Sequence, residues 1–315
     1  MSKYKTFKEF YDDRLLPELT VLDGERKRVD RKVVLIILVV IAVIYITGRF
    51  MTTAAPYIQV PAGILGLVAA SLVSKNYRQS FKNKIITKIT AYMDENLAYS
   101  PEGTVPKEAF MRSAIFQQSC EYYKGEDHFN GMLDKTAVEF SEVVAKHKTS
   151  SGTGSDRKES YSTIFKGIFF VADFNKNFQG HTVVLPDTAE KLLGKFGQRL
   201  QGMSSRGKLV KLEDPEFEKE FCVYADDQVE ARYILSTSLM QRILEFKRKW
   251  NTKVFLSFRD SKVYIAIRMN KNLFETRLFK SIVDYKFIEE NTYFLTLLTG
   301  IVDDLNLNTR IWTKA

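Results

Sequence analysis

"VDRKVVLIILVVIAVIYITGRF", residues 29–50, decides how the rest of this chain is interpreted. Between Val33 and Ile46, twelve of fourteen residues are Val, Leu or Ile, and no polar face recurs at the helical or the strand period. Each such residue at the centre of a bilayer favours insertion by roughly 0.3–0.6 kcal/mol. Extended through Met51, the stretch reaches about 19 residues, close to the ~20 that a helix needs to cross the hydrocarbon. We therefore predict a transmembrane helix.

A second apolar stretch follows almost directly, "AAPYIQVPAGILGLVAASLVS", residues 54–74. It carries no charge, and its two prolines lie near its start, where a helix loses little by lacking an N–H group. Ala62, Gly66 and Ala70 recur every four residues, a spacing that allows the backbones of two helices to approach closely. The two stretches together predict a transmembrane helical hairpin with a very short turn.

Basic residues flank the outer ends of this hairpin, whereas only Arg49 lies near the turn. An excess of Lys and Arg marks the cytoplasmic side of a membrane protein, so both termini are expected to be cytoplasmic in a multi-pass protein of the inner (plasma) membrane. Each charge near an anionic lipid surface contributes about 1 kcal/mol of attraction. The candidates for contact with lipid headgroups are Arg26, Arg28, Lys75, Arg78, Lys82 and Lys84, with a plain orientation signal as the alternative.

The net charge of +9 is concentrated around the hairpin. Residues 1–99 hold 15 basic and 9 acidic residues, a balance of +6, which leaves +3 for the rest of the chain. The excess of basic residues is therefore explained by membrane topology, and no nucleic-acid partner is predicted. Two cysteines, Cys120 and Cys222, are too few and too far apart for a disulfide framework or a thiolate zinc site.

Four segments are expected along the chain. An N-terminal cytosolic helix occupies residues 1–32, with Thr6 and Glu9 in a capping-box pattern and Pro17 as the point of a kink. The transmembrane hairpin occupies residues 33–74, and a helical stalk and linker occupies residues 75–125. The remaining residues, 126–315, are predicted to form an α+β cytosolic domain.

The α+β prediction depends on alternating and β-branched strand runs that are segregated from the helical runs, which favours this class over a parallel doubly wound sheet. Strands are predicted at "HFNGML" (128–133), "TAVEFSEVVAKH" (136–147), "STIFKGIFFVADFN" (162–175), "HTVVLP" (181–186), "KLVKL" (208–212) and "EFCVYA" (220–225), with a hairpin over residues 253–268. A polar Gly/Ser-rich loop is predicted at residues 148–160, and helices at residues 107–116, 186–202, 237–250 and 278–305. We expect one antiparallel sheet with covering helices.

Motifs for catalysis are scarce. The chain has no Gly-x-Ser-x-Gly elbow, no phosphate-binding loop and no dinucleotide fingerprint. The three histidines, His128, His147 and His181, lack the pairing of a metal site. No cofactor, metal or catalytic residue is therefore assigned.

Clustered carboxylates offer one alternative. Asp214, Asp226 and Asp227 stand close together in sequence, near Glu213, Glu216 and Glu230. Two carboxylates held close can share a proton or bind a divalent cation, which is the basis for a membrane-tethered hydrolase as an alternative function. Solvated strand ends and turns are the simpler interpretation of the same residues.

Four stretches resemble a bacterial membrane-protein family, domain of unknown function 3137. They are "FKEFYDDRLLPEL" (7–19), "GIFFVADFNKNFQGHTVVLPD" (167–187), "LVKLEDPEFEKEFCVYADDQVEARYILSTSLMQRIL" (209–244) and "LNLNTRIW" (305–312). The resemblance implies a paired membrane segment followed by a cytosolic domain, and it implies a LemA-type membrane protein as a partner. It implies no activity and no site residues.

The function predicted from these observations is that of a membrane-anchored binding or scaffold protein that faces the cytosol. Its expected partners are membrane lipid and another membrane protein, and a homo-oligomer is left open. No enzymatic activity is predicted, although the hydrolase alternative stays open.

Overall fold

The computed structural model describes residues 4–51, 53–151, 158–174, 176, 178–187 and 207–307. The chain divides into two compact units that each combine segments distant in sequence. The first unit consists of residues 1–93 and 274–294, and the second of residues 94–273 and 295–315. The four-segment division drawn from the sequence stays a prediction.

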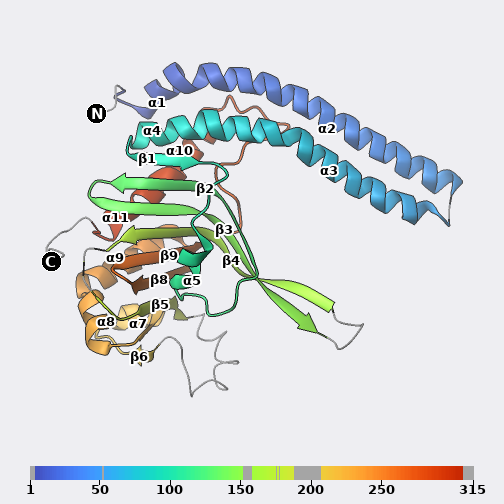
Figure 1. The fold of residues 1–315 in the computed structure, drawn as a ribbon. Coiled ribbons are helices and arrows are strands. Elements are labelled where there is room, and N and C mark those ends of the chain that lie inside the picture. Colours follow the sequence, from blue (N-terminus) through green and yellow to red (C-terminus); the bar gives the residue numbers. More distant parts are fainter. Residues whose placement is uncertain are drawn as a thin grey trace. The chain divides into compact units, whose positions relative to one another are not determined.

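Two long helices build most of the first unit (Figure 1). The first runs through α1 (Phe7–Phe10), the π-helical turn η1 (Tyr11–Leu15) and α2 (Leu16–Phe50). The second runs through α3 (Ala55–Phe81), the π-helical turn η2 (Lys82–Ile86) and α4 (Thr87–Met93). Both are long and apolar enough to cross a membrane.

The start of the first helix follows its predicted signals. The side chain of Thr6 accepts a hydrogen bond from the backbone N–H of Glu9, which caps the helix. Pro17 lies in the first turn of α2, directly after the π-helical turn at Tyr11–Leu15. A proline supplies no N–H to the preceding turn, so the irregularity falls where the kink was predicted.

The two helices of the hairpin contact each other through small and polar residues. A Cβ atom on Gly66 would lie 2.6 Å from Val40 Cγ2, so any larger residue would have to displace Val40 or move the helices apart. Nearer the turn, Gln59 Nε2 donates to the carbonyl oxygen of Ile44 at 3.2 Å and to Thr47 Oγ1 at 3.1 Å. The only side-chain amide of the second apolar stretch, that of Gln59, thus has its hydrogen-bond partners in the first stretch.

The second unit is built on an antiparallel sheet. Within the described residues nine strands pair in the order β1-β2-β3-β4-β9-β8-β5-β7-β6. Their bounds are β1 Leu97–Ser100, β2 Tyr122–Leu133, β3 Thr136–Ser151, β4 Lys158–Asp173, β5 Thr182–Pro186, β6 Lys208–Val210, β7 Phe221–Ala225, β8 Val254–Arg259 and β9 Lys262–Arg268. The predicted α+β class is confirmed.

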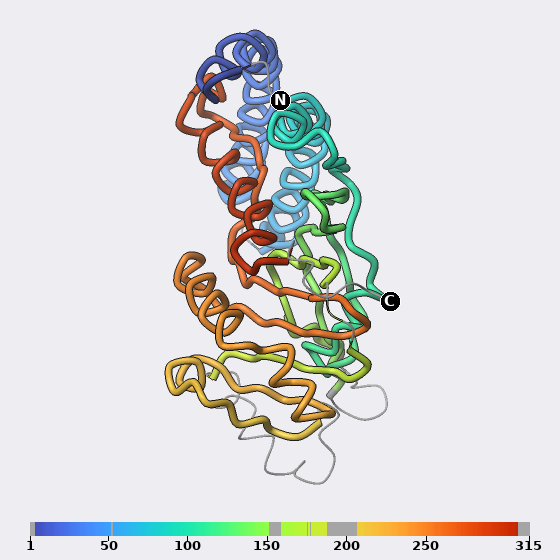
Figure 2. The backbone as a smooth tube through the Cα atoms, turned by 90° about the vertical axis from the view of Figure 1, so that its left-hand side faces the viewer, coloured from blue at the N-terminus to red at the C-terminus, as the bar shows by residue number. Residues whose placement is uncertain are grey.

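Helices cover both faces of this sheet. They are α5 Lys107–Arg112, α7 Pro215–Glu220, α8 Gln228–Ile234, α9 Thr237–Trp250 and α11 Ile301–Asp304, whereas α10 Tyr285–Thr299 contributes to both units. Figure 2 places α7, α8 and α9 on one side of the strands and the chain around α5 on the other. Consecutive side chains of β4 point to opposite faces of the sheet. Phe169 packs on Phe110 of α5, and Phe170 packs on Phe140 of β3.

Several local predictions need correction. β1, α7 and α8 were not expected, because each is only four to seven residues long. The polar loop predicted at residues 148–160 is shorter, since β3 continues to Ser151 and β4 begins at Lys158. The last long helix begins at Tyr285, not near residue 278. The helix predicted over residues 186–202 lies, from residue 188 onward, outside the described residues.

Candidate membrane-surface site

One of the predicted lipid-facing cations, Arg26, is an internal counterion. Its Nε donates to Asp23 Oδ1 at 2.8 Å, and its Nη1 pairs with Asp30 one turn farther along α2. Only 6% of Arg26 is exposed, and Asp23 is buried to the same degree. The hydrogen bond from Arg26 holds the pKa of the Asp23 carboxyl far below its usual range. A buried guanidinium with two carboxylates is not free for a lipid headgroup.

The same carboxylates hold a non-helical segment of the first unit, residues 274–284, here called the strap. Asp23 Oδ1 accepts from Ser281 Oγ at 3.1 Å and from the N–H of Ile282 at 3.2 Å. Asp30 Oδ1 accepts from the N–H of Phe279 at 3.2 Å. The strap thus obtains from side chains of α2 the hydrogen bonds that a helix or strand would supply within itself.

The second helix of the hairpin binds the strap through Tyr77. Its hydroxyl donates to the carbonyl oxygen of Arg277 at 3.2 Å and accepts from Thr276 Oγ1 at 2.8 Å. Burial raises the pKa of Tyr77 to about 12, so this phenol stays a donor at neutral pH. α2, α3 and the strap are therefore joined by one polar network.

Lys82 is a second internal counterion. It is 4% exposed, and its Nζ lies 3.4 Å from Glu275 Oε1 at the start of the strap. The partner of Lys82 lies far away in the sequence and gave no local signal, whereas Asp23 and Asp30 stand at the i−3 and i+4 positions of Arg26 and could have indicated its ion pairs.

The other four candidates are exposed. Arg28, Lys75 and Lys84 have no ion-pair partner among the described residues, and Arg78 donates only to Ser74 Oγ at 2.8 Å. The candidate membrane-surface site therefore reduces to Arg28, Lys75, Arg78 and Lys84.

The acidic residues of the predicted site accept hydrogen bonds from backbone N–H groups. Asp214 caps α7 by accepting from the N–H groups of Glu216 and Phe217, both at 3.0 Å. Asp227 caps α8 by accepting from the N–H groups of Val229 and Glu230. These carboxylates precede helices, not the strand ends and turns favoured from the sequence. An aspartate followed by Pro215 was the available signal for the start of α7.

Asp226 and Glu230 hold the chain that enters β5. Asp226 Oδ2 accepts from the N–H of His181 at 3.2 Å, and Glu230 accepts from the N–H groups of Gln179 and Gly180 at 2.8 and 2.7 Å. In the described part of the chain, no three His, Cys, Asp or Glu residues are grouped so that they could hold a metal ion. Each carboxylate of the predicted acidic site thus has a local structural partner.

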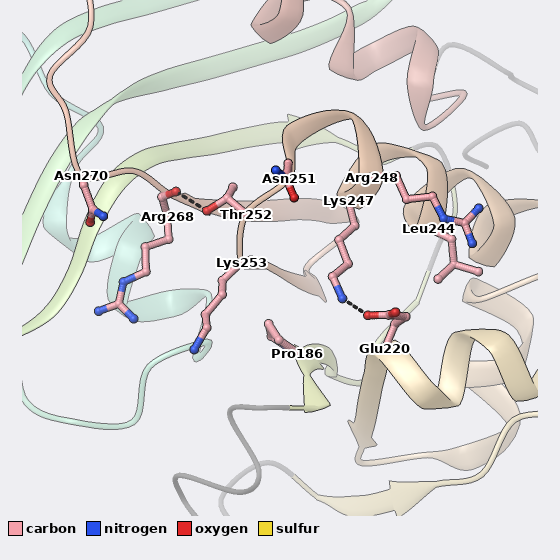
Figure 3. A pocket seen from close by; sticks show the side chains of 10 residues that line it. All are labelled: Pro186, Glu220, Leu244, Lys247, Arg248, Asn251, Thr252, Lys253, Arg268 and Asn270. Atoms are coloured by element: carbon pink, nitrogen blue, oxygen red, sulfur yellow. Dashed lines mark hydrogen bonds and ion pairs between the residues drawn. The ribbon is translucent and has the colours of Figure 1, made fainter.

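A hollow in the second unit brings together residues that sequence inspection did not single out (Figure 3). It measures about 580 Å³ and lies where β5 and β9 end and where β7 and β8 begin, beside the last turn of α9. Four cations line it, Lys247, Arg248, Lys253 and Arg268, with Glu220 as the one acid. Lys247 and Arg248 belong to the last turn of α9, and Lys253 and Arg268 belong to the two ends of the β8–β9 hairpin.

One known protein family matches the part of the chain that carries these residues. Residues 163–307 match DUF3137. The family is described as a protein of unknown function, and the match confirms the resemblance predicted from the sequence. The DUF3137 segment contains the strap, the acidic residues and all the cations of the hollow, but none of the four exposed cations of the candidate membrane-surface site. No curated protein and no solved structure matches the chain.

Proposed function

We propose that this protein is a membrane-anchored binding protein whose helical hairpin crosses the inner membrane. The observation that carries the proposal is the outward orientation of the apolar side chains of both long helices. Leu35 and Leu38 of α2 are 62% and 57% exposed, and Leu65 and Leu67 of α3 are 68% and 75% exposed. Such continuous apolar surface is unfavourable in water and favourable in lipid.

We further propose that both ends of the hairpin lie on the cytoplasmic side and that the DUF3137 segment acts there. Arg28, Lys75, Arg78 and Lys84 support this orientation, because they lie beyond the outer ends of the apolar stretches and have no carboxylate partner among the described residues. At that level they contact anionic headgroups. A LemA-type membrane protein is the proposed protein partner, on the family resemblance alone.

Binding is preferred to hydrolysis as the activity of the cytosolic part. Asp214 and Asp227 are occupied as helix caps and Asp226 holds a backbone amide, so a hydrolytic site at these residues would have to give up structural hydrogen bonds.

Cysteine accessibility tests the orientation. Thr53, in the turn of the hairpin, and Glu218, in α7, are both exposed and are changed singly to cysteine in a chain with Cys120→Ala and Cys222→Ala. A membrane-impermeant maleimide added to intact cells should label the Thr53→Cys chain at once and the Glu218→Cys chain only after permeabilisation. Labelling of Glu218→Cys in intact cells would refute the proposed topology.

Native mass spectrometry of the purified protein tests the headgroup contacts. Replacing Arg28, Lys75, Arg78 and Lys84 together by Gln should remove most of the anionic lipid that is retained, since each charge contributes about 1 kcal/mol. The matched control replaces Lys208, Lys211, Lys219 and Lys262, which are exposed in the second unit, and should retain lipid as the unmodified chain does. Equal loss in both variants would show a general charge effect and contradict the proposed site.

A further inference from the structure

The hollow beside α9 has a hydrogen-bonded rim at one end of the β8–β9 hairpin. The N–H of Arg268 donates to the carbonyl oxygen of Lys253 at 3.0 Å, and Thr252 Oγ1 donates to the carbonyl oxygen of Arg268 at 2.7 Å. Lys253 and Arg268 are therefore neighbours across the two strands. In Figure 3 both side chains extend in the same direction from the rim.

The four cations of the hollow fall into two classes. Lys247 is paired with Glu220, and Arg248 is paired with Glu216. Lys253 and Arg268 have no ion-pair partner among the residues that the structure describes. Two positive charges thus stand side by side without compensation, an arrangement that attracts an anion.

Neutral groups complete the lining. Asn251 and Asn270 contribute side-chain amides, and Leu244 and Pro186 contribute apolar surface that is otherwise buried. Asn251 has φ +47° and closes the C-terminus of α9, a conformation that asparagine tolerates better than most residues. The volume of about 580 Å³ lies within the ~300–1,000 Å³ of small-molecule sites.

We propose that this hollow binds a phosphomonoester dianion through Lys253 and Arg268. A phosphomonoester carries about −1.5 to −2 charges at pH 7, which matches the two uncompensated cations. The guanidinium fork of Arg268 suits two phosphate oxygens, the ammonium of Lys253 adds a point charge, and the amides serve the remaining acceptors. This site goes beyond membrane anchoring, since its ligand need not be a lipid.

The charges around the hollow favour a compact ligand. Four cations less Glu216 and Glu220 leave a net +2, and the two acids stand on the α9 side of the hollow. A long polyanion that extended from Lys253 toward α9 would meet these carboxylates. A single phosphate group with a small organic part avoids them.

Titration calorimetry on the full chain in nanodiscs of zwitterionic lipid tests the proposal with glycerol 3-phosphate as the soluble probe and glycerol as the uncharged control. Saturable binding of the phosphate, with a Kd below about 1 mM, and none of glycerol is expected. Lys253→Gln with Arg268→Gln should weaken binding at least tenfold, whereas the matched pair Lys208→Gln with Lys211→Gln should leave it unchanged.

A second variant shows whether misfolding causes a loss of phosphate binding. Asn270 is exposed, so Asn270→Asp adds a carboxylate to the hollow without disturbing the core, and it should also weaken binding at least tenfold while the melting temperature without ligand stays the same. Wild-type binding by these variants both here and in the lipid experiment below would overturn the proposal.

The same chemistry is present in a lipid, because the headgroup of phosphatidate is also a phosphomonoester. A parallel arm counts the phosphatidate retained in native mass spectra, with the same variants and without glycerol 3-phosphate. Dependence on Lys253 and Arg268 only in this arm identifies a headgroup ligand, and dependence only in calorimetry identifies a soluble one. Dependence in neither arm refutes the site and leaves the cysteine-accessibility test of membrane topology unaffected.

Discussion

The hairpin and the sheet use the same apolar residue types in opposite ways. In the most apolar windows of the two long helices, only 11% and 6% of residues are buried within the protein, whereas Phe140, Phe169 and Phe170 of the sheet are fully buried. Both regions also bury charged residues, Asp23, Arg26 and Lys82 in the first unit and Asp127 and Glu142 in the second. The difference in apolar burial is the one expected between a surface that could face lipid and a domain that folds in water, and both helices are long and apolar enough to span a membrane.

The largest effects are expected when an aspartate is introduced into the core of the sheet or onto the apolar surface of the hairpin. Phe169→Asp should destabilise the second unit by at least about 5 kcal/mol, because it removes a core aromatic side chain and buries an unpaired carboxylate. Circular dichroism and limited proteolysis should then report an unfolded domain.

Leu67→Asp is the counterpart in the hairpin. This position is 75% exposed, so the fold of the purified protein in detergent should hardly change, while membrane insertion should become less favourable by about 3 kcal/mol. Carbonate extraction of membranes measures the insertion. A folded Phe169→Asp domain, or a Leu67→Asp chain that inserts normally, would contradict the assignment of the two solvents.

A smaller effect is expected at the buried charges of the first unit. Asp23→Asn removes the carboxylate shared by Arg26 and the strap, and it should destabilise this unit by about 3 kcal/mol, since a buried cation loses one of its two partners. Hydrogen exchange of the N–H of Ile282 reports on the strap directly. Asp12→Asn, in an exposed pair with Lys8, is the control and should change little.

The same carboxylate gives a pH dependence of known sign. The pKa of Asp23 is lower in the folded chain than in the unfolded one, so its contribution is complete above the unfolded value of about 4. The contribution is lost as the pH falls from there through the folded pKa. Protection of the strap should therefore be constant from neutral pH down to about 5 and decline in stronger acid, and Asp23→Asn should abolish the part of this decline that Asp23 causes.

The smallest effect concerns the contact between the helices. Gly66→Val should weaken the hairpin by about 1–3 kcal/mol, because its Cβ would overlap Val40. Gly63→Val is a matched control, since no atom lies within 4 Å of the added Cβ. The extent of disulfide formation between cysteines introduced at Ile44 and Gln59 compares the contact between the helices in the two variants. Equal trapping would mean that Gly66 does not set the distance between the helices.

Elements with a continuous local pattern could be predicted from the sequence. The helix α9 was expected over residues 237–250 and has these bounds, because its apolar face recurs at the helical spacing, Ser236 caps its start and Asn251 closes its end. The β8–β9 hairpin was likewise expected over residues 253–268, where the two strands occupy Val254–Arg259 and Lys262–Arg268. Both apolar helices were predicted for the same reason.

Features that depend on distant partners could not be predicted. Residues 278–284 have a composition compatible with helix, but Asp23 and Asp30 accept the N–H groups of Ile282 and Phe279 from 259 and 249 residues away. Those bonds keep the strap non-helical, and the same carboxylates withdraw Arg26 from the surface. In the hollow, the closeness of Lys253 and Arg268 follows from the predicted hairpin, but the pairing of Glu220 with Lys247 across 27 residues does not follow from any local pattern.

The division of the first unit between residues 1–93 and 274–294 has a consequence for biogenesis. A ribosome releases the chain from its N-terminus, so both long helices are complete about 180 residues before the strap exists. During that interval Asp23, Asp30 and Tyr77 lack the backbone groups that they later hold. A nascent chain, or one truncated before residue 274, would therefore keep the pairs of Arg26 with Asp23 and Asp30 but lack the bonds of Asp23, Asp30 and Tyr77 to the strap.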